Sequence, residues 1–247
     1  MEEKKYIIEI ATSDFATTQS AVEGGADRIE LCANLTEGGT TQSYATIKKC
    51  REAFEGLLYP IIRPRGGDFL YTKDEFDIML QDVKLCKQLG CDGVVIGMLN
   101  MDGSIDVART AKLIDAAYPM GVTFHRAFDR CREPFEALEQ LIEIGCERIL
   151  TSGQKPTVSD AGAVEMIAEL NKRADNRIII MPGSGVRADN IKMLAEKTDC
   201  TEFHSSLRGK TKSMMQFIHP AFKDLEERYS NNAIKPDDVS ALRNNLS

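Results

Sequence analysis

Two spacings of hydrophobic residues alternate along the chain. Short runs rich in Val, Ile and Leu, such as YIIEI and DGVVIG, are separated by longer segments in which apolar residues recur every three or four positions. The short runs are typical of strands buried on both faces, and the longer spacing is typical of amphipathic helices. The pattern predicts eight strands, at residues 6–10, 27–32, 58–63, 92–97, 120–125, 147–151, 177–181 and 200–204.

Signals at the segment ends support this pattern. Thr72 and Glu75 can form a capping box at the start of one helix, and Gly90 follows the end of that helix. Pro134 begins another helix, and Gly145 follows it. One sequence pattern occurs three times, in residues 24–31, 89–96 and 144–150. In each copy a glycine is followed by any residue, then by Asp or Glu, and then by a predicted strand. A repeated joint between helix and strand indicates a repeated βα unit.

Alternating strands and helices can form a closed barrel or a doubly wound open sheet. The length of 247 residues and the regular spacing favour the barrel, and no dinucleotide-binding fingerprint opens the first βα unit. We therefore predict an α/β fold, a single (β/α)8 TIM barrel over residues 1–247. Residues 208–247 are predicted to form an irregular tail and a closing helix from about Pro236, with the apolar patch 214–218 packed on the barrel base.

Composition narrows the class of protein. The formal charge of −7 disfavours nucleic acid as a partner, and no polybasic run points to a membrane surface. The amino-terminal apolar stretch is short and interrupted by Glu9, unlike a signal peptide, so we expect a cytoplasmic protein. The seven cysteines are odd in number and contain no C-x-x-C spacing, which argues against a disulfide framework and a structural zinc site.

Ionisable residues gather where the predicted strands end. In a barrel the carboxyl ends of the strands converge on one mouth, so scattered side chains become one cluster. The candidates for proton transfer are Glu9, Glu30, His125, Asp129 and His204. An ion-pair network that only fills the barrel is the alternative, because buried charges are costly unless they are paired. A histidine can likewise be purely structural.

Other residues at the same ends suit an anion. Guanidinium groups match carboxylate or phosphate, and backbone N–H groups after the seventh strand commonly hold phosphate in this fold. The candidate ligand-binding residues are Arg63, Arg65, Arg126, Ser152, Gly183, Ser184 and Gly185. A plain tight turn is the alternative interpretation of the two glycines.

A copper site requires soft ligands, because Cu(I) prefers thiolate and thioether sulfur. Cys32 ends the second strand and is the candidate metal ligand. Cys131, Met98 and Met101 lie near other strand ends, but no tight spacing motif joins them.

Several motifs together resemble the CutC family of copper homeostasis proteins, from about residue 7 to residue 208. The motifs are GGADRIELC (24–32), EGGTT (37–41), IRPRGGDFLYT (62–72), DGVVIGML (92–99), VTFHRAFD (122–129), RILTSGQ (148–154), MPGSGV (181–186) and EFHSSLR (202–208). The resemblance implies a TIM barrel, a cytoplasmic location, a homo-oligomer that is often a dimer, and a link to copper that has been questioned within the family. It implies no established reaction.

One position departs from the family pattern. Many relatives carry Glu-x-Cys at the end of the first strand, whereas this chain reads Glu9-Ile10-Ala11. A two-thiol Cu(I) site built from the first two strands would lose one ligand, while the matching Cys32 is kept.

Two functions follow from these observations. One is a CutC-like cytoplasmic protein of copper homeostasis that binds copper. The other is a TIM-barrel enzyme that applies acid–base chemistry to a small anionic or phosphorylated metabolite, with the arginines holding the anion and Glu9, Glu30 or His125 exchanging a proton. A non-catalytic metal carrier and a pure scaffold are further alternatives. The expected partner is therefore a small anionic ligand or a copper ion.

Overall fold

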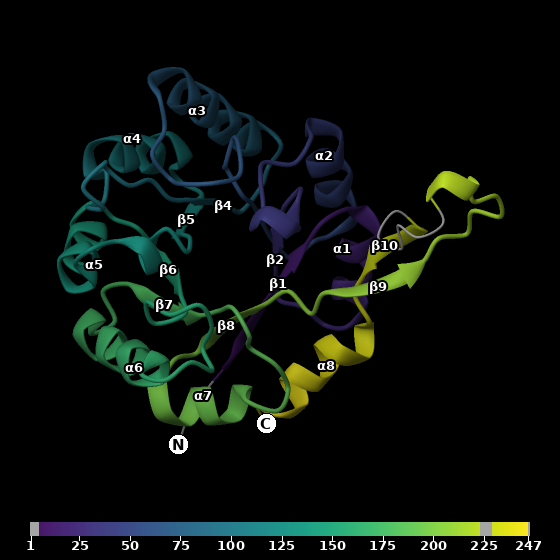
Figure 1. Cartoon of the computed structure of the whole chain (residues 1–247). Helices are drawn as coiled ribbons and strands as arrows, with labels where there is room; N and C mark the ends of the chain where they lie inside the picture. Colours follow the sequence, from purple (N-terminus) through teal and green to yellow (C-terminus); the bar gives the residue numbers. More distant parts are fainter. Residues whose placement is uncertain (1–4, 223–228, 247) are drawn as a thin grey trace.

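Eight parallel strands form a closed barrel surrounded by helices (Figure 1). The computed structural model describes residues 5–222 and 229–246. The barrel strands are β1 Ile7–Thr12, β2 Arg28–Leu31, β3 Leu57–Pro60, β4 Gly93–Ile96, β5 Gly121–Phe124, β6 Arg148–Thr151, β7 Ile179–Pro182 and β8 Glu202–Ser205. The predicted α/β TIM barrel is confirmed.

The strands pair in two sheets, in the orders β3-β2-β1-β8 and β4-β5-β6-β7. The first junction between the sheets is a parallel bridge between Ile61 and Val95, where the Ile62 N–H donates to the Val95 carbonyl at 2.8 Å. At the second junction β7 lies beside β8, which closes the ring.

The helices follow the strands in regular alternation and lie outside the barrel (Figure 1). They are α1 Phe15–Glu23, α2 Tyr44–Ala53, α3 Lys73–Gln88, α4 Val107–Ala117, α5 Pro134–Glu143, α6 Ala163–Ala174, α7 Ile191–Thr198 and α8 Pro236–Asn244. The capping box predicted from Thr72 and Glu75 begins α3. Buried aliphatic residues on the outer face of the strands and the inner face of the helices form the main core.

The three repeated joints have the same geometry. Gly25, Gly90 and Gly145 each follow a helix with a φ of +87°, +75° and +76°, a region that glycine adopts without strain. In two of the joints the next acidic residue satisfies a strand amide, since Asp27 accepts from Ile8 N–H at 2.8 Å and Asp92 accepts from Leu58 N–H at 2.9 Å. The repeat in the sequence is therefore a structural repeat at the amino ends of the strands.

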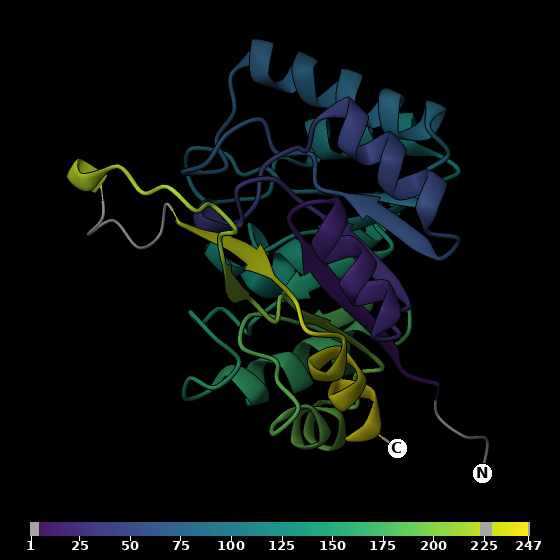
Figure 2. The same cartoon turned by 90° about the vertical axis from the view of Figure 1, so that its right-hand side faces the viewer.

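The tail differs from its prediction in part. It forms an antiparallel hairpin, β9 Gly209–Lys212 with β10 Ser230–Ala233, that extends away from the barrel (Figures 1 and 2). Met214 and Phe217 are 96% and 67% exposed, so the prediction that patch 214–218 packs on the barrel base is wrong. The closing helix is present as α8, which lies between α7 and α1 in the outer ring.

Candidate functional site

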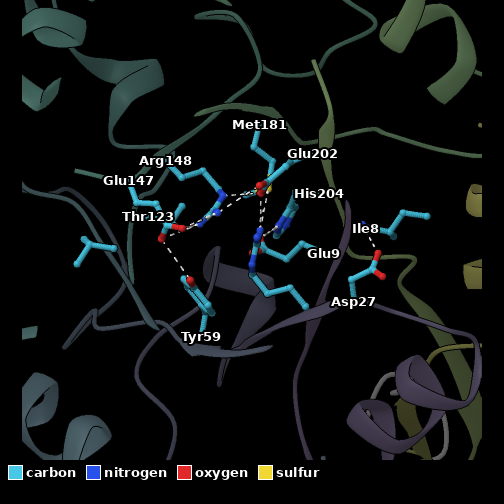
Figure 3. Close-up of polar contacts among 12 residues, drawn as sticks. Ile8, Glu9, Asp27, Tyr59, Thr123, Glu147, Arg148, Met181, Glu202 and His204 are labelled. Atoms are coloured by element: carbon cyan, nitrogen blue, oxygen red, sulfur yellow. Dashed lines mark hydrogen bonds and ion pairs between the residues drawn. The ribbon is translucent and has the colours of Figure 1, made fainter. Parts of the chain in front are cut away.

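Charged side chains from the amino ends of β2, β6 and β8 form an ion-pair network inside the barrel, called here the floor (Figure 3). It consists of Arg28, Arg148, Glu202, Glu147 and Tyr59. Glu202 Oε2 accepts from Arg28 Nη1 at 2.7 Å and from Arg148 Nε at 2.5 Å. Both guanidinium groups stack on the Tyr59 ring, with their central carbons 5.1 and 5.6 Å from the ring centroid.

A second set of contacts lies above the floor and joins Glu9, His204 and Glu30. His204 Nδ1 lies 2.7 Å from Glu9 Oε1, and its Nε2 lies 3.8 Å from Glu30 Oε2. Glu9 also faces Arg28 of the floor, with 3.4 Å between Oε2 and Nη1. The imidazole is therefore held between two carboxylates, of which Glu9 is fully buried.

Their surroundings separate the protonation of these three groups. Burial acts to raise the pKa of Glu9, but the His204 hydrogen bond and the Arg28 charge outweigh it and lower that pKa to about 2. Burial raises the pKa of Glu30 to about 7, and the Glu9 charge adds to this effect against the opposing charge of His204. Burial acts to lower the pKa of His204, but the two carboxylates raise it overall. Glu30 is thus the carboxyl of the set that titrates near neutral pH.

A cavity of about 880 Å³ opens above these residues at the barrel mouth. Glu30 and His204 form part of its lower wall, and the loops that follow the strands form the rest. Its other charged lining residues are Glu37, Arg63, Arg126, Asp129, Arg130, Lys155 and Arg208. Positive side chains therefore outnumber carboxylates around this cavity.

His125 lines the cavity from the end of β5 and is buried. Its Nδ1 accepts a hydrogen bond from the Ala127 N–H at 3.1 Å, whereas its Nε2 has no partner in the described parts of the chain. Burial and the neighbouring Arg63 charge lower the pKa of His125 to about 3. The ring is therefore neutral at physiological pH.

Arg63 braces two loops of the mouth. Its Nη1 donates to the carbonyls of Glu37 and Gly39 at 2.8 and 2.7 Å, and its Nη2 donates to the Gly67 carbonyl at 2.9 Å. The guanidinium also stacks on Phe69. Its charge is thus held at the cavity wall by neutral groups.

Arg126, Asp129 and Ser152 form one hydrogen-bonded group. Arg126 Nε donates to Asp129 Oδ2 at 2.7 Å, and its Nη2 donates to Ser152 Oγ at 2.7 Å. Asp129 also accepts from Thr151 Oγ1 at 2.5 Å and from the Ser152 N–H at 3.0 Å. Arg126 and Asp129 line the cavity, while Ser152 is buried behind them, so this group fixes the loop after β6.

The remaining predicted ligand-binding residues divide into two sets. Ser184 and Gly185 line the cavity, whereas Gly183 packs against Leu150 and His204. Arg65 lies outside the cavity wall, where its Nε donates to Glu75 Oε1 at 2.6 Å.

Cys32 is buried beneath the loop that follows β2. A side chain at Gly39 would approach its Sγ to 3.2 Å, which shows how closely this loop covers the thiol. Burial and the adjacent Glu30 raise the pKa of Cys32 well above its usual value. Over residues 5–222 and 229–246, no group of three or more His, Cys, Asp or Glu side chains could hold a metal ion.

Sequence reasoning missed two sets of charged residues. Arg28 and Arg148 follow the acidic residue of the repeated joint, so their shared place in the repeat was a usable signal. Arg130 ends a single 3-10 turn, and Lys155 and Arg208 lie in loops. Hydrophobic periodicity does not predict where side chains point in such short or irregular segments.

The family is established by sequence comparison. The model of the CutC family matches residues 6–209. The chain belongs to the CutC family. A CutC family protein of Chromobacterium violaceum is 51% identical over 211 residues, covering 85% of each chain. Another, of Parabacteroides distasonis, is 54% identical over 215 residues, covering 86% of this chain and 87% of the relative.

A solved CutC structure has the same fold. The protein described as a putative copper homeostasis protein CutC from Streptococcus agalactiae superimposes with a TM-score of 0.78 at 30% identity, covering 81% of this chain and 98% of that one. No helix in the described part of this chain is long and apolar enough to cross a membrane. The cytoplasmic location and the dimer stay predictions.

Proposed function

We propose that the barrel mouth binds a small anionic molecule and that Glu30 exchanges a proton with it. The observation that carries this proposal is the unbalanced charge of the cavity. Arg63, Arg130, Lys155 and Arg208 line it, and none of them forms an ion pair with a carboxylate in the described ranges. The chain as a whole is acidic, with a net charge of −7, so this positive patch is local. An anion would supply the missing negative charge.

The size of the cavity suits a metabolite. A volume of about 880 Å³ lies within the range of small-molecule sites, roughly 300 to 1,000 Å³. Its loop-built rim and barrel-built base resemble the usual arrangement of sites in this fold, at the carboxyl ends of the strands.

Glu30 is the group best placed to move a proton. It lines the cavity and has a pKa of about 7, so both of its protonation states are populated at neutral pH. His204 holds it from behind and is itself anchored by Glu9. Glu9 is therefore a positioning residue that touches no ligand, and His204 connects it to the reacting carboxyl.

The test is deuterium exchange into candidate ligands. The protein is incubated in D2O with a panel of small carboxylates and sugar phosphates, and loss of carbon-bound proton signals is followed by NMR. A substrate should lose one signal, and Glu30→Gln should slow that loss by about 100-fold or more. Since the carboxylate is the base, the rate should rise with pH through about 7.

The control is Glu139→Gln, which removes an exposed carboxylate paired with Arg177 far from the mouth and should leave exchange unchanged. Equal exchange in native protein and Glu30→Gln, or a rate that is flat from about pH 5 to 9, would refute the role of Glu30.

Copper handling is the second candidate, and the description of the Streptococcus agalactiae relative as a putative copper homeostasis protein favours it. The donor set does not fit a Cu(I) site in this cavity. Cys32 supplies one buried thiol with a raised pKa, and the position that carries a second thiol in many relatives is Ala11. Thiolate, not thiol, is the form that binds metal, so these residues offer Cu(I) no pair of ready ligands.

A further inference from the structure

The neutral imidazole of His125 is a hydrogen-bond donor that has no role in the proton transfer proposed above. The Ala127 N–H donates to Nδ1, so Nδ1 carries no proton and Nε2 must carry it. That Nε2–H is buried and lacks a partner in the described chain. A buried donor without an acceptor is unfavourable, which points to an acceptor supplied by a ligand.

The His125 ring is held rigidly in this orientation. Phe69 packs against it, with 4.9 Å between the ring centroids. Gly97 also lies against the ring, and a Cβ atom there would fall 2.4 Å from it. The fold therefore leaves room for the ring by using glycine, and the direction of its N–H is fixed before any ligand arrives.

His125 is distinct from the other unpaired groups of the cavity. Buried Arg63 also has an unpaired Nε, but its Nη1 and Nη2 donate to three backbone carbonyls of the mouth loops. Arg130, Lys155 and Arg208 are exposed basic side chains at the rim. His125 alone among these groups offers a neutral N–H at depth, with the Arg63 charge beside it.

We propose that His125 donates its Nε2–H to a carbonyl oxygen of the substrate, while the rim cations hold the substrate's anionic group. The inference rests on the proposed function and narrows its substrate to a small anionic carbonyl compound. Glu30 on β2 takes a proton from the carbon beside the carbonyl. The electron pair of the broken C–H bond forms a C=C bond, and the carbonyl electrons move to oxygen, giving an enolate that His125 stabilises.

The reaction is completed when protonated Glu30 returns the proton to carbon, so that no other reactant is consumed. A neutral N–H beside a fixed positive charge suits an oxygen whose charge develops during the reaction. The reaction class is therefore enolisation, which includes isomerisation and exchange at the carbon beside a carbonyl.

The experiment uses histidine-labelled protein and two probes. The chain has three histidines, His125, His204 and His219, so long-range 1H–15N spectra can be assigned with His125→Gln and His219→Gln. His125 should show the Nε2-protonated tautomer throughout about pH 5 to 8, since its pKa is about 3. Oxalate, a planar enolate mimic, should move its Nε2–H signal downfield, and inorganic phosphate, bound at the rim, should leave it in place.

Affinity measurements with matched variants complete the test. His125→Phe keeps a ring against Phe69 but removes the donor, so it should weaken oxalate binding by about tenfold or more and leave phosphate binding unchanged. His125→Gln restores an N–H and should recover most of the oxalate affinity. Unchanged phosphate affinity shows that the cavity is intact in each variant.

Four outcomes separate the two proposals. An Nδ1-protonated His125, or oxalate binding that leaves its signal and the His125→Phe affinity unchanged, overturns the role of His125 alone. Phosphate binding without oxalate binding overturns it as well. If neither probe binds native protein, the anion site itself is wrong and both proposals fall.

Discussion

The floor and the mouth of this barrel both contain arginine side chains, but those of the floor are paired with carboxylates and several at the mouth are not. In the floor, Arg28 and Arg148 share Glu202, and each also stacks on Tyr59. At the mouth, Arg130 and Arg208 face a cavity and form no ion pair with a carboxylate of the described chain. Charged side chains therefore stabilise the barrel interior in the floor, whereas at the mouth they form a candidate ligand site.

The difference follows from burial. Charges removed from water must be paired within the protein, because the cost of leaving one unpaired is several kcal/mol. Charges at a solvent-filled mouth remain hydrated until a ligand replaces the water. The Glu9–His204–Glu30 set lies between the two levels, with Glu9 tied to the floor and Glu30 open to the cavity.

The largest expected effect is on the floor. Glu202→Gln keeps the shape of the side chain but removes the charge that both arginines share. We expect the free energy of unfolding to fall by about 3 kcal/mol or more, because two buried cations lose the carboxylate they share and keep only Glu9 and the exposed Glu147 as partners. Urea unfolding followed by circular dichroism measures the change.

The matched control is again Glu139→Gln, whose pair with Arg177 is about half exposed. Loss of an exposed pair should cost about 1 kcal/mol or less. Similar losses in the two variants would contradict the distinction between a buried network and a hydrated surface.

A smaller effect is expected at the rim, on ligand affinity and not on stability. Arg130→Gln should weaken the binding of inorganic phosphate by about tenfold, the size of one charge-assisted hydrogen bond. Arg132→Gln removes the same charge two residues away, from a side chain paired with Asp102 outside the cavity. Isothermal titration calorimetry should find phosphate affinity unchanged in Arg132→Gln. Equal weakening in both variants would mean that the loss of affinity comes from the change in net charge and not from a contact made by Arg130.

The barrel could be predicted from the sequence because strand burial and helix amphipathicity both leave a period in the chain. Depth inside the barrel was harder to predict. The apolar run ends at Ile10, yet β1 continues to Thr12 through pairing with β2, which places Glu9 below the mouth. An error of two residues in the predicted end of a strand therefore decides whether a carboxylate is expected to contact a ligand or only another side chain.

Loop residues of the site could not be placed from periodicity. Arg63 and Arg65 are two positions apart and their spacing predicts the same role, but the chain leaves the strand before them. Arg65 then pairs with Glu75, the third helical residue in the capping box of α3, while Arg63 stays at the cavity. The position of Cys32 after a strand likewise predicts a place at the mouth, and the loop through Gly39 covers it.

The smallest expected effect is that of Cys32→Ser on Cu(I) binding. A buried thiol with a raised pKa, beside the carboxyl of Glu30, gives Cu(I) neither a ready thiolate nor a second soft ligand. An anaerobic titration against a chromophoric Cu(I) chelator should give the same weak affinity for native protein, Cys32→Ser and the control Cys86→Ser, whose thiol is buried in α3. Tight binding lost only in Cys32→Ser would mean that the loop after β2 opens to admit the metal, and the mouth would then be a copper site as well as an anion site.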